Sequence, residues 1–220
     1  MNISVTTMPN YNEKLPFIKA YAKIEFNNQY CINNLTIREK KSGELYVKMP
    51  QALRAETNQN GTKERVYKDI VYPKTADLRE QISAAVIHTY NSCGIGKKYF
   101  AADIDMEINS ITPSVFKDKT GTIGSLRVDM GDFVIPNFYV QRTANGFERV
   151  NCSSSERLFK YEDGSTKTKS VQAFVFLKEE EYDLFCQKAM GIFHEKENEI
   201  KGINPINLTD LTNSKRQSRK

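Results

Sequence analysis

Alternating apolar and polar residues are the first pattern in this 220-residue chain. In YAKIEF, residues 21–26, Ala22, Ile24 and Phe26 share one face of an extended strand, and the charged residues take the other face. SLRVDM, residues 125–130, repeats the alternation with the same order of charge signs. The pattern predicts two half-buried antiparallel strands, one in each half of the chain.

A second pair of predicted strands follows at a constant offset of 103 residues. QYCINNLTIR, residues 29–38, matches DFVIPNFYVQ, residues 132–141. In both stretches the apolar positions change phase at the centre, across Asn-Asn in the first copy and Pro-Asn in the second. Such a change of phase predicts a β-bulge in each strand.

Each copy then ends in an amphipathic helix, which follows a long polar loop and one more strand. The loops are expected at 51–65 and 153–170, and the strands at 66–72 and 171–177. Apolar residues at helical spacing form one stripe per helix: Leu78, Ile82, Ala85 and Val86 in the first, and Tyr182, Phe185, Ala189, Ile192 and Phe193 in the second. Acidic residues near the start of each helix complement its dipole.

These correspondences, in the same order, predict that one ancestral unit occurs twice in the chain. The expected fold class is α+β, with two units that each hold a small antiparallel β-sheet and a C-terminal helix and that pair as an intramolecular pseudo-dimer. The expected boundaries are 1–95 for the first unit, 96–102 for a linker, 103–200 for the second unit and 201–220 for a basic, disordered tail. Gly94 is expected to cap the first helix.

Composition indicates a compartment and disfavours several classes of protein. No run approaches the roughly 18 apolar residues of a membrane span, and MNISVTTMPN lacks the pattern of a signal peptide, so we expect a cytoplasmic protein. The four cysteines form no CxxC pair and are expected to be reduced thiols. His88 and His194 lie inside predicted helices, so we expect no cofactor, no metal and no enzymatic activity.

The net charge of +5 is unevenly distributed along the chain. Residues 1–100 hold 15 Lys/Arg and 9 Asp/Glu, a net of +6, whereas residues 101–210 hold 13 and 18, a net of −5. The last ten residues, LTNSKRQSRK, add four cations and no acid. The basic first half and tail favour a negatively charged partner.

Four stretches of the first copy resemble the SpoVG family of septation regulators: YAKIEFN, YCINNLTIR, GELYVKMPQ and YKDIVYP. The resemblance covers residues 2–91 and includes two successive strands that end at Pro50 and Pro73. The second copy is similar only weakly, with Cys152-Ser153 where the family pattern has Met-Pro. The resemblance implies two SpoVG-like units in one chain.

The resemblance also implies a function. Members of that family pair through their sheets into dimers and act as DNA- or RNA-binding regulators, with contacts in a basic stretch at the helix start. At that place this sequence has Arg79 but Gln81 in the position of the family's lysine, with Glu80 between them. In the second copy Lys178 is followed by three glutamates, which repel phosphate.

The candidate nucleic-acid contacts are cations of the polar loops, the first helix and the tail: Arg54, Lys63, Arg65, Lys68, Arg79, Arg157, Lys160, Lys167, Lys169, Lys215, Arg216, Arg219 and Lys220. A cation that neutralises a phosphate releases counterions, which makes binding depend on salt. Tyr67, Phe159 and Tyr161 add rings that can stack on unpaired bases. No base-reading motif is present, so contacts to the backbone should dominate.

Other interpretations stay open at this point. Acids among the loop cations, such as Glu64 and Glu162, equally fit an ordinary solvated arm, and the tail could serve solubility alone. The alternative function is a protein-interaction or assembly module that docks partners through strand edges or through the acidic second half. The paired units could also associate further.

Overall fold

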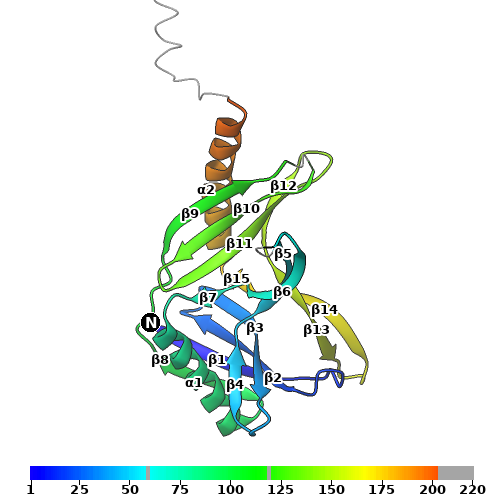
Figure 1. Ribbon diagram of the computed structural model, residues 1–220. Helices are drawn as coiled ribbons and strands as arrows, with labels where there is room; N and C mark the ends of the chain where they lie inside the picture. The colour runs from blue at the N-terminus through cyan, green and yellow to red at the C-terminus, as the bar shows by residue number, and fades with distance from the viewer. Residues whose placement is uncertain (58–59, 118–119, 203–220) are drawn as a thin grey trace, which may run out of the picture.

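Two antiparallel sheets, each packed against one helix, form the body of the protein (Figure 1). The computed structural model describes residues 1–57, 60–117 and 120–202. Within these residues one sheet has six strands, the other has five, and two further pairs of strands form separate hairpins. The expected α+β class, with antiparallel sheets and two helices, is confirmed.

The first half of the chain supplies five strands of the six-stranded sheet: a β1–β2–β3 meander, with β4 on β3 and β8 on the outer edge of β1. The elements of the first half of the chain are β1 (Asn2–Pro9), β2 (Ile18–Phe26), β3 (Tyr30–Glu39), β4 (Leu45–Lys48), β5 (Gln51–Thr57), β6 (Lys63–Asp69), β7 (Tyr72–Pro73), α1 (Ala76–Cys93) and β8 (Gly96–Ala101). Helix α1 begins at a defined cap, because the Thr75 hydroxyl accepts a hydrogen bond from the Leu78 backbone N–H at 3.2 Å.

The second half has the same order of elements as β1 to α1, with no counterpart of β8 in the described residues. It contains β9 (Ile108–Val115), β10 (Gly121–Met130), β11 (Phe133–Arg142), β12 (Glu148–Cys152), β13 (Ser154–Lys160), β14 (Thr166–Gln172), β15 (Phe174–Phe176) and α2 (Glu179–Ile200). Strands β9 to β12 pair in the same sequence as β1 to β4. Both predicted helical stripes are confirmed, since Leu78, Ile82 and Val86 of α1 and Phe185, Ala189 and Phe193 of α2 are buried.

The β-bulge predicted in each half is also confirmed. Asn33 and Asn34 of β3 lie opposite a single residue of β2. Pro136 and Asn137 of β11 lie opposite a single residue of β10. Asn34 has a φ of +61°, a left-handed conformation that asparagine tolerates better than most residues. The bulge bends β3 and β11 at positions 103 residues apart in the chain.

Each half sends one short strand into the sheet of the other half. Strand β15 pairs with β3, which sets Phe176 opposite Tyr30. Strand β7 pairs with β11, which sets Pro73 opposite Phe133. The two pairs correspond at the 103-residue offset, because Tyr30 matches Phe133 and Pro73 matches Phe176. Neither sheet is therefore complete without a strand from the other half.

One hydrophobic core extends through both halves. The fully buried ring of Phe26 meets the ring of Phe133 edge-on, with 5.5 Å between the centroids. The ring centre of Phe174 on β15 lies 5.8 Å from the ring centre of Tyr30 in the first half and 6.1 Å from that of Phe138 in the second. Aromatic contacts of this kind join the halves by buried apolar area as well as by backbone hydrogen bonds.

The expectation of polar loops at 51–65 and 153–170 is wrong, because most of these residues form β-hairpins. Strand β5 pairs with β6, and β13 pairs with β14, each along seven residues. The connecting turns contain Gly61 and Gly164, whose φ angles of +78° and +79° cost glycine little. We call the β5–β6 hairpin arm 1 and the β13–β14 hairpin arm 2.

The segment 96–102, expected to be a linker, does connect the halves, and most of it forms strand β8. β8 pairs antiparallel with β1. The Gly96 backbone N–H also donates to the Thr7 hydroxyl at 3.1 Å. The predicted cap at Gly94 is confirmed, since its N–H donates to the Tyr90 carbonyl at 2.7 Å. The connection is therefore part of the first sheet.

Candidate nucleic-acid interface

Both arms lie against the opposite half of the molecule (Figure 1). Arg54 of arm 1 donates a hydrogen bond from Nη1 to the Tyr139 hydroxyl on β11 at 2.8 Å. Arg157 takes the corresponding position on arm 2, with its guanidinium 5.4 Å from the centre of the Tyr21 ring on β2. These two arginines were predicted to contact nucleic acid, and in the structure each holds an arm against the body.

The bulge of the first sheet holds arm 2 in place. The Asn34 side-chain nitrogen donates to the Ser155 hydroxyl at 2.8 Å and to the Val171 carbonyl at 3.2 Å. The Asn33 side-chain nitrogen donates to the Gln172 carbonyl at 3.0 Å. The two residues of the bulge therefore give arm 2 a fixed direction relative to β3.

The other predicted arm cations are exposed: Lys63, Arg65 and Lys68 on arm 1, and Lys160, Lys167 and Lys169 on arm 2. Strand pairing puts Lys63, Arg65 and Tyr67 on one face of arm 1, because alternate residues share a face. Tyr67 is itself 67% exposed. This face offers two cations and one ring to solvent.

The remaining predicted contacts are Arg79 on α1 and four cations of the tail. The Arg79 guanidinium forms an ion pair with Asp69 at 2.9 Å, so its charge is partly neutralised within the first half. Lys215, Arg216, Arg219 and Lys220 lie outside the described residues.

A groove of about 320 Å³ separates the two arms over the outer face of the first sheet. Tyr21, Arg38 and Lys48 contribute to its sheet side, Tyr67 comes from arm 1, and Ser155 comes from arm 2. The groove therefore combines cations from the sheet with an aromatic ring from arm 1 and one acidic residue, Glu156, from arm 2. Sequence reasoning missed Arg38 and Lys48, because nothing local in the chain indicates that the arms flank them.

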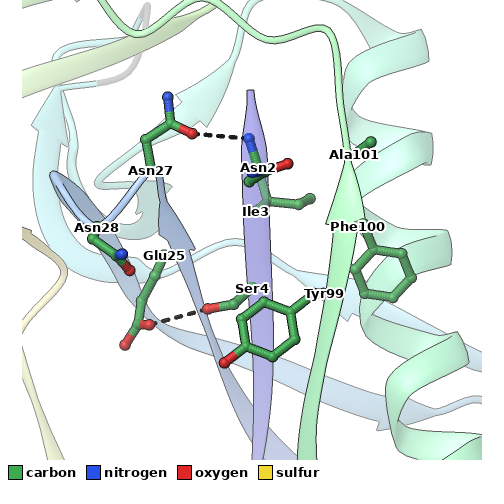
Figure 2. Close-up of a pocket in the computed structure, with 9 residues that line it drawn as sticks. All are labelled: Asn2, Ile3, Ser4, Glu25, Asn27, Asn28, Tyr99, Phe100 and Ala101. Atoms are coloured by element: carbon green, nitrogen blue, oxygen red, sulfur yellow. Dashed lines mark hydrogen bonds between the residues drawn. The ribbon is translucent and has the colours of Figure 1, made fainter.

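A second hollow lies between β1, β2 and β8, at the edge of the first sheet (Figure 2). The Glu25 carboxylate faces it and accepts hydrogen bonds from Lys23 at 2.5 Å, Lys97 at 2.9 Å and the Ser4 hydroxyl at 3.0 Å. Burial alone would raise the pKa of Glu25, but these donors outweigh it and lower that pKa from 4.5 to about 2. Lys23 and Lys97, two lysines of the sheet, thus form ion pairs with Glu25.

Because the pKa of Glu25 is lower in the folded protein than in the unfolded chain, its contribution to stability is complete above about pH 4.5 and is lost as the pH falls toward 2. We expect acidification from pH 5 to pH 3 to lower the free energy of unfolding, with about 1–2 kcal/mol of the decrease due to Glu25. Urea unfolding of the wild type and of Glu25→Gln at several pH values measures that share. A difference between the two proteins that does not change with pH would contradict it.

The described parts of the chain contain no group of three or more His, Cys, Asp or Glu side chains that could hold a metal, and neither helix there is long and apolar enough to cross a bilayer. All four cysteines are free. Cys31 and Cys152 are buried, which raises the pKa of each thiol to about 12.

The fold and this surface define an α+β protein of two interlocked antiparallel sheets that carries two hairpin arms with exposed cations. The SpoVG family profile matches residues 1–92. A septation protein of the SpoVG type from Exiguobacterium sp. is 31% identical over 78 residues, which is 36% of this chain and 70% of that protein. The chain belongs to the SpoVG family.

Two further relatives are described in the same words. The SpoVG-type protein of Heliobacterium modesticaldum is 34% identical over 73 residues, 33% of this chain and 72% of its own. That of Treponema denticola is 33% identical over 78 residues, 36% of this chain and 74% of its own. No solved structure matches the chain.

Proposed function

We propose that this protein is a regulator that binds DNA or RNA, mainly through the nucleic-acid backbone. The observation that carries the proposal is the pair of arms, which project exposed lysines and an arginine on rigid hairpins: Lys63, Arg65, Lys68, Lys160, Lys167 and Lys169. Cations held on ordered strands lose little entropy when they meet phosphates. Membership of the SpoVG family supports the same role.

We also propose that the chain is a tandem duplication folded as an intramolecular pseudo-dimer. The support is the reciprocal exchange of β7 and β15 at a constant sequence offset. Arg54 and Arg157, at matching positions, each reach across to the opposite half. In this arrangement the two arms flank a common surface, as the equivalent parts of a two-chain dimer would.

An assembly module is the second candidate function. It is favoured by the first turn of α2, where Glu179, Glu180 and Glu181 occupy the place of the basic stretch in the family pattern. Three carboxylates at a helix start repel phosphate, so this end of the second half fits a cationic protein partner better than a nucleic acid.

Binding of short labelled duplex DNA, single-stranded DNA and RNA, measured at two salt concentrations, tests the proposal. We expect dissociation constants of about 10⁻⁴ to 10⁻⁶ M at physiological salt and a steep loss of affinity as salt rises. An arm variant replaces four exposed cations with glutamine: Lys63, Arg65, Lys167 and Lys169. Its salt dependence, as the slope of log K against log salt, should be shallower by about 3.

A matched variant controls for net charge by replacing four exposed lysines outside the arms: Lys40, Lys41, Lys188 and Lys196. It should keep most of the affinity and nearly all of the slope. Absence of binding by the wild type even at low salt would leave only the assembly module. If a chain without residues 212–220 loses all binding, the folded part is not the nucleic-acid reader.

A further inference from the structure

One face of arm 2 carries an unbroken alternation of cations and aromatic rings. Strand pairing sets Arg157 opposite Lys169 and Phe159 opposite Lys167, and Tyr161 follows Phe159 on the same side at the turn. We call these five residues the cation–aromatic face. Strand geometry spaces Phe159 and Tyr161 by about 7 Å along the arm.

The side chains of this face contact one another in order from the body outward. The Arg157 guanidinium lies 5.4 Å from the Tyr21 ring centre and 4.2 Å from that of Phe159. Lys169 Nζ lies 5.9 Å from the centre of Phe159 and 5.1 Å from that of Tyr161. Cation–π contacts therefore fix both the rings and the charges.

The charge of the face is also one-sided. Glu156 points to the opposite face of the hairpin, because it pairs with Ser170 one position away from the Arg157–Lys169 pair and alternate positions share a face. Asp163, in the turn, accepts a hydrogen bond from the Ser165 backbone N–H at 2.9 Å. Lys167 and Lys169 are exposed, and Phe159 and Tyr161 are partly exposed. The two strand pairs of this face, Arg157–Lys169 and Phe159–Lys167, contain no carboxylate, and the nearest acids in sequence, Glu162 and Asp163, follow at the turn.

Arm 1 indicates that the hairpin scaffold does not require these residues. At the 103-residue offset, Lys167 and Lys169 correspond to Glu64 and Val66, and only Arg157 has its counterpart in Arg54. Both hairpins nevertheless pair over the same seven positions. The cation–aromatic face is therefore particular to arm 2.

We infer that the cation–aromatic face of arm 2 binds single-stranded nucleic acid, with unpaired bases stacked on Phe159 and Tyr161 and phosphates near Lys167 and Lys169. This inference rests on the proposed function and names its substrate class. An aromatic side chain can stack on a base only where that base is unpaired and not stacked on its neighbour in a duplex. The lysines, in contrast, attract the phosphates of single strands and duplexes alike. A face that combines such rings with lysines therefore binds single-stranded nucleic acid in preference to a duplex.

The test compares binding of a single-stranded oligonucleotide with binding of a blunt hairpin duplex of the same length, using the full chain. In Phe159→Leu/Tyr161→Leu, we expect affinity for the single strand to fall about 5- to 150-fold per ring. Affinity for the duplex should change less than about twofold, and the salt slope should stay the same because every cation remains. Phe159→Tyr/Tyr161→Phe keeps both rings and should bind like the wild type.

A matched control removes a ring elsewhere. Tyr99→Leu deletes a side chain that is 75% exposed and has Lys97 Nζ 5.2 Å from its ring centre, but that lies on β8, away from the arms. It should leave both affinities unchanged. Circular dichroism of each variant checks that the fold is intact.

The outcomes separate the two proposals. If the wild type binds neither the single strand nor the duplex, that result overturns the proposed function and this inference with it. Wild type that binds nucleic acid, but binds the duplex as tightly as the single strand or loses nothing in the Leu/Leu variant, overturns this inference alone. Equal losses in the Leu/Leu variant and in Tyr99→Leu also overturn it.

Discussion

Replacing Phe174 with alanine is expected to lower the free energy of unfolding by about 3–5 kcal/mol. The side chain is 1% exposed and contacts rings from both halves, Tyr30 and Phe138. Truncation therefore leaves a cavity at the point where β15 crosses into the first sheet. Because neither sheet is complete alone, we expect the variant to unfold in one transition at lower denaturant, measured by urea titration.

Leu184→Ala is the matched control for this loss. Leu184 lies on α2 and is 67% exposed, so its truncation should change stability by no more than about 0.5 kcal/mol. A loss below about 1 kcal/mol for Phe174→Ala would mean that β15 contributes little to the first sheet. An independent transition for each half would contradict the interlocked fold.

The second large effect is expected at Gly124 of β10, which lies directly against the Phe193 ring of α2. A Cβ added there would overlap the Phe193 ring and lie 2.6 Å from the Ser114 carbonyl oxygen. Since Phe193 is fully buried and Ser114 belongs to the paired strand β9, neither can move freely. We expect Gly124→Ala to destabilise the protein by about 1–3 kcal/mol through overpacking, measured by thermal or urea unfolding.

Gly191→Ala provides a matched glycine within α2. A Cβ there meets nothing within 4 Å, so the substitution should stabilise the helix by about 0.5–1 kcal/mol. If Gly124→Ala were as stable as the wild type, α2 would not pack on β10 as the structure has it.

The regular parts of the fold could be predicted because they have one buried face and one exposed face. Alternation in β2 and β10, the helical stripes and the change of phase at Asn33-Asn34 all depend on a core on one side. These features follow from local sequence and were confirmed by the structure.

The arms were missed because both faces of each hairpin are largely solvated. Polar strands such as β14, TKTKSVQ, have no apolar period to mark them. A usable signal was present in the turns, where Asn60-Gly61 and Asp163-Gly164 are typical of tight hairpins. Weighing that signal would have predicted both arms.

The exchange of β7 and β15 could not be predicted from local pattern. These strands are two and three residues long, and the pattern of each would suit the sheet of either half. The choice depends on the path of the whole chain. For the same reason, the sequence did not indicate that Arg54 and Arg157 would be held against the opposite half while Lys63, Arg65, Lys167 and Lys169 stayed exposed.

Nuclear Overhauser contacts across the short strands of the labelled full chain test the interlocked fold most directly. The account predicts backbone contacts between Cys31 and Val175 and between Tyr72 and Val134, one pair in each sheet. Contacts of Cys31 with Tyr72, together with contacts of Val134 with Val175, would mean that each half keeps its own strand. That result would contradict the exchange and the pseudo-dimer built on it.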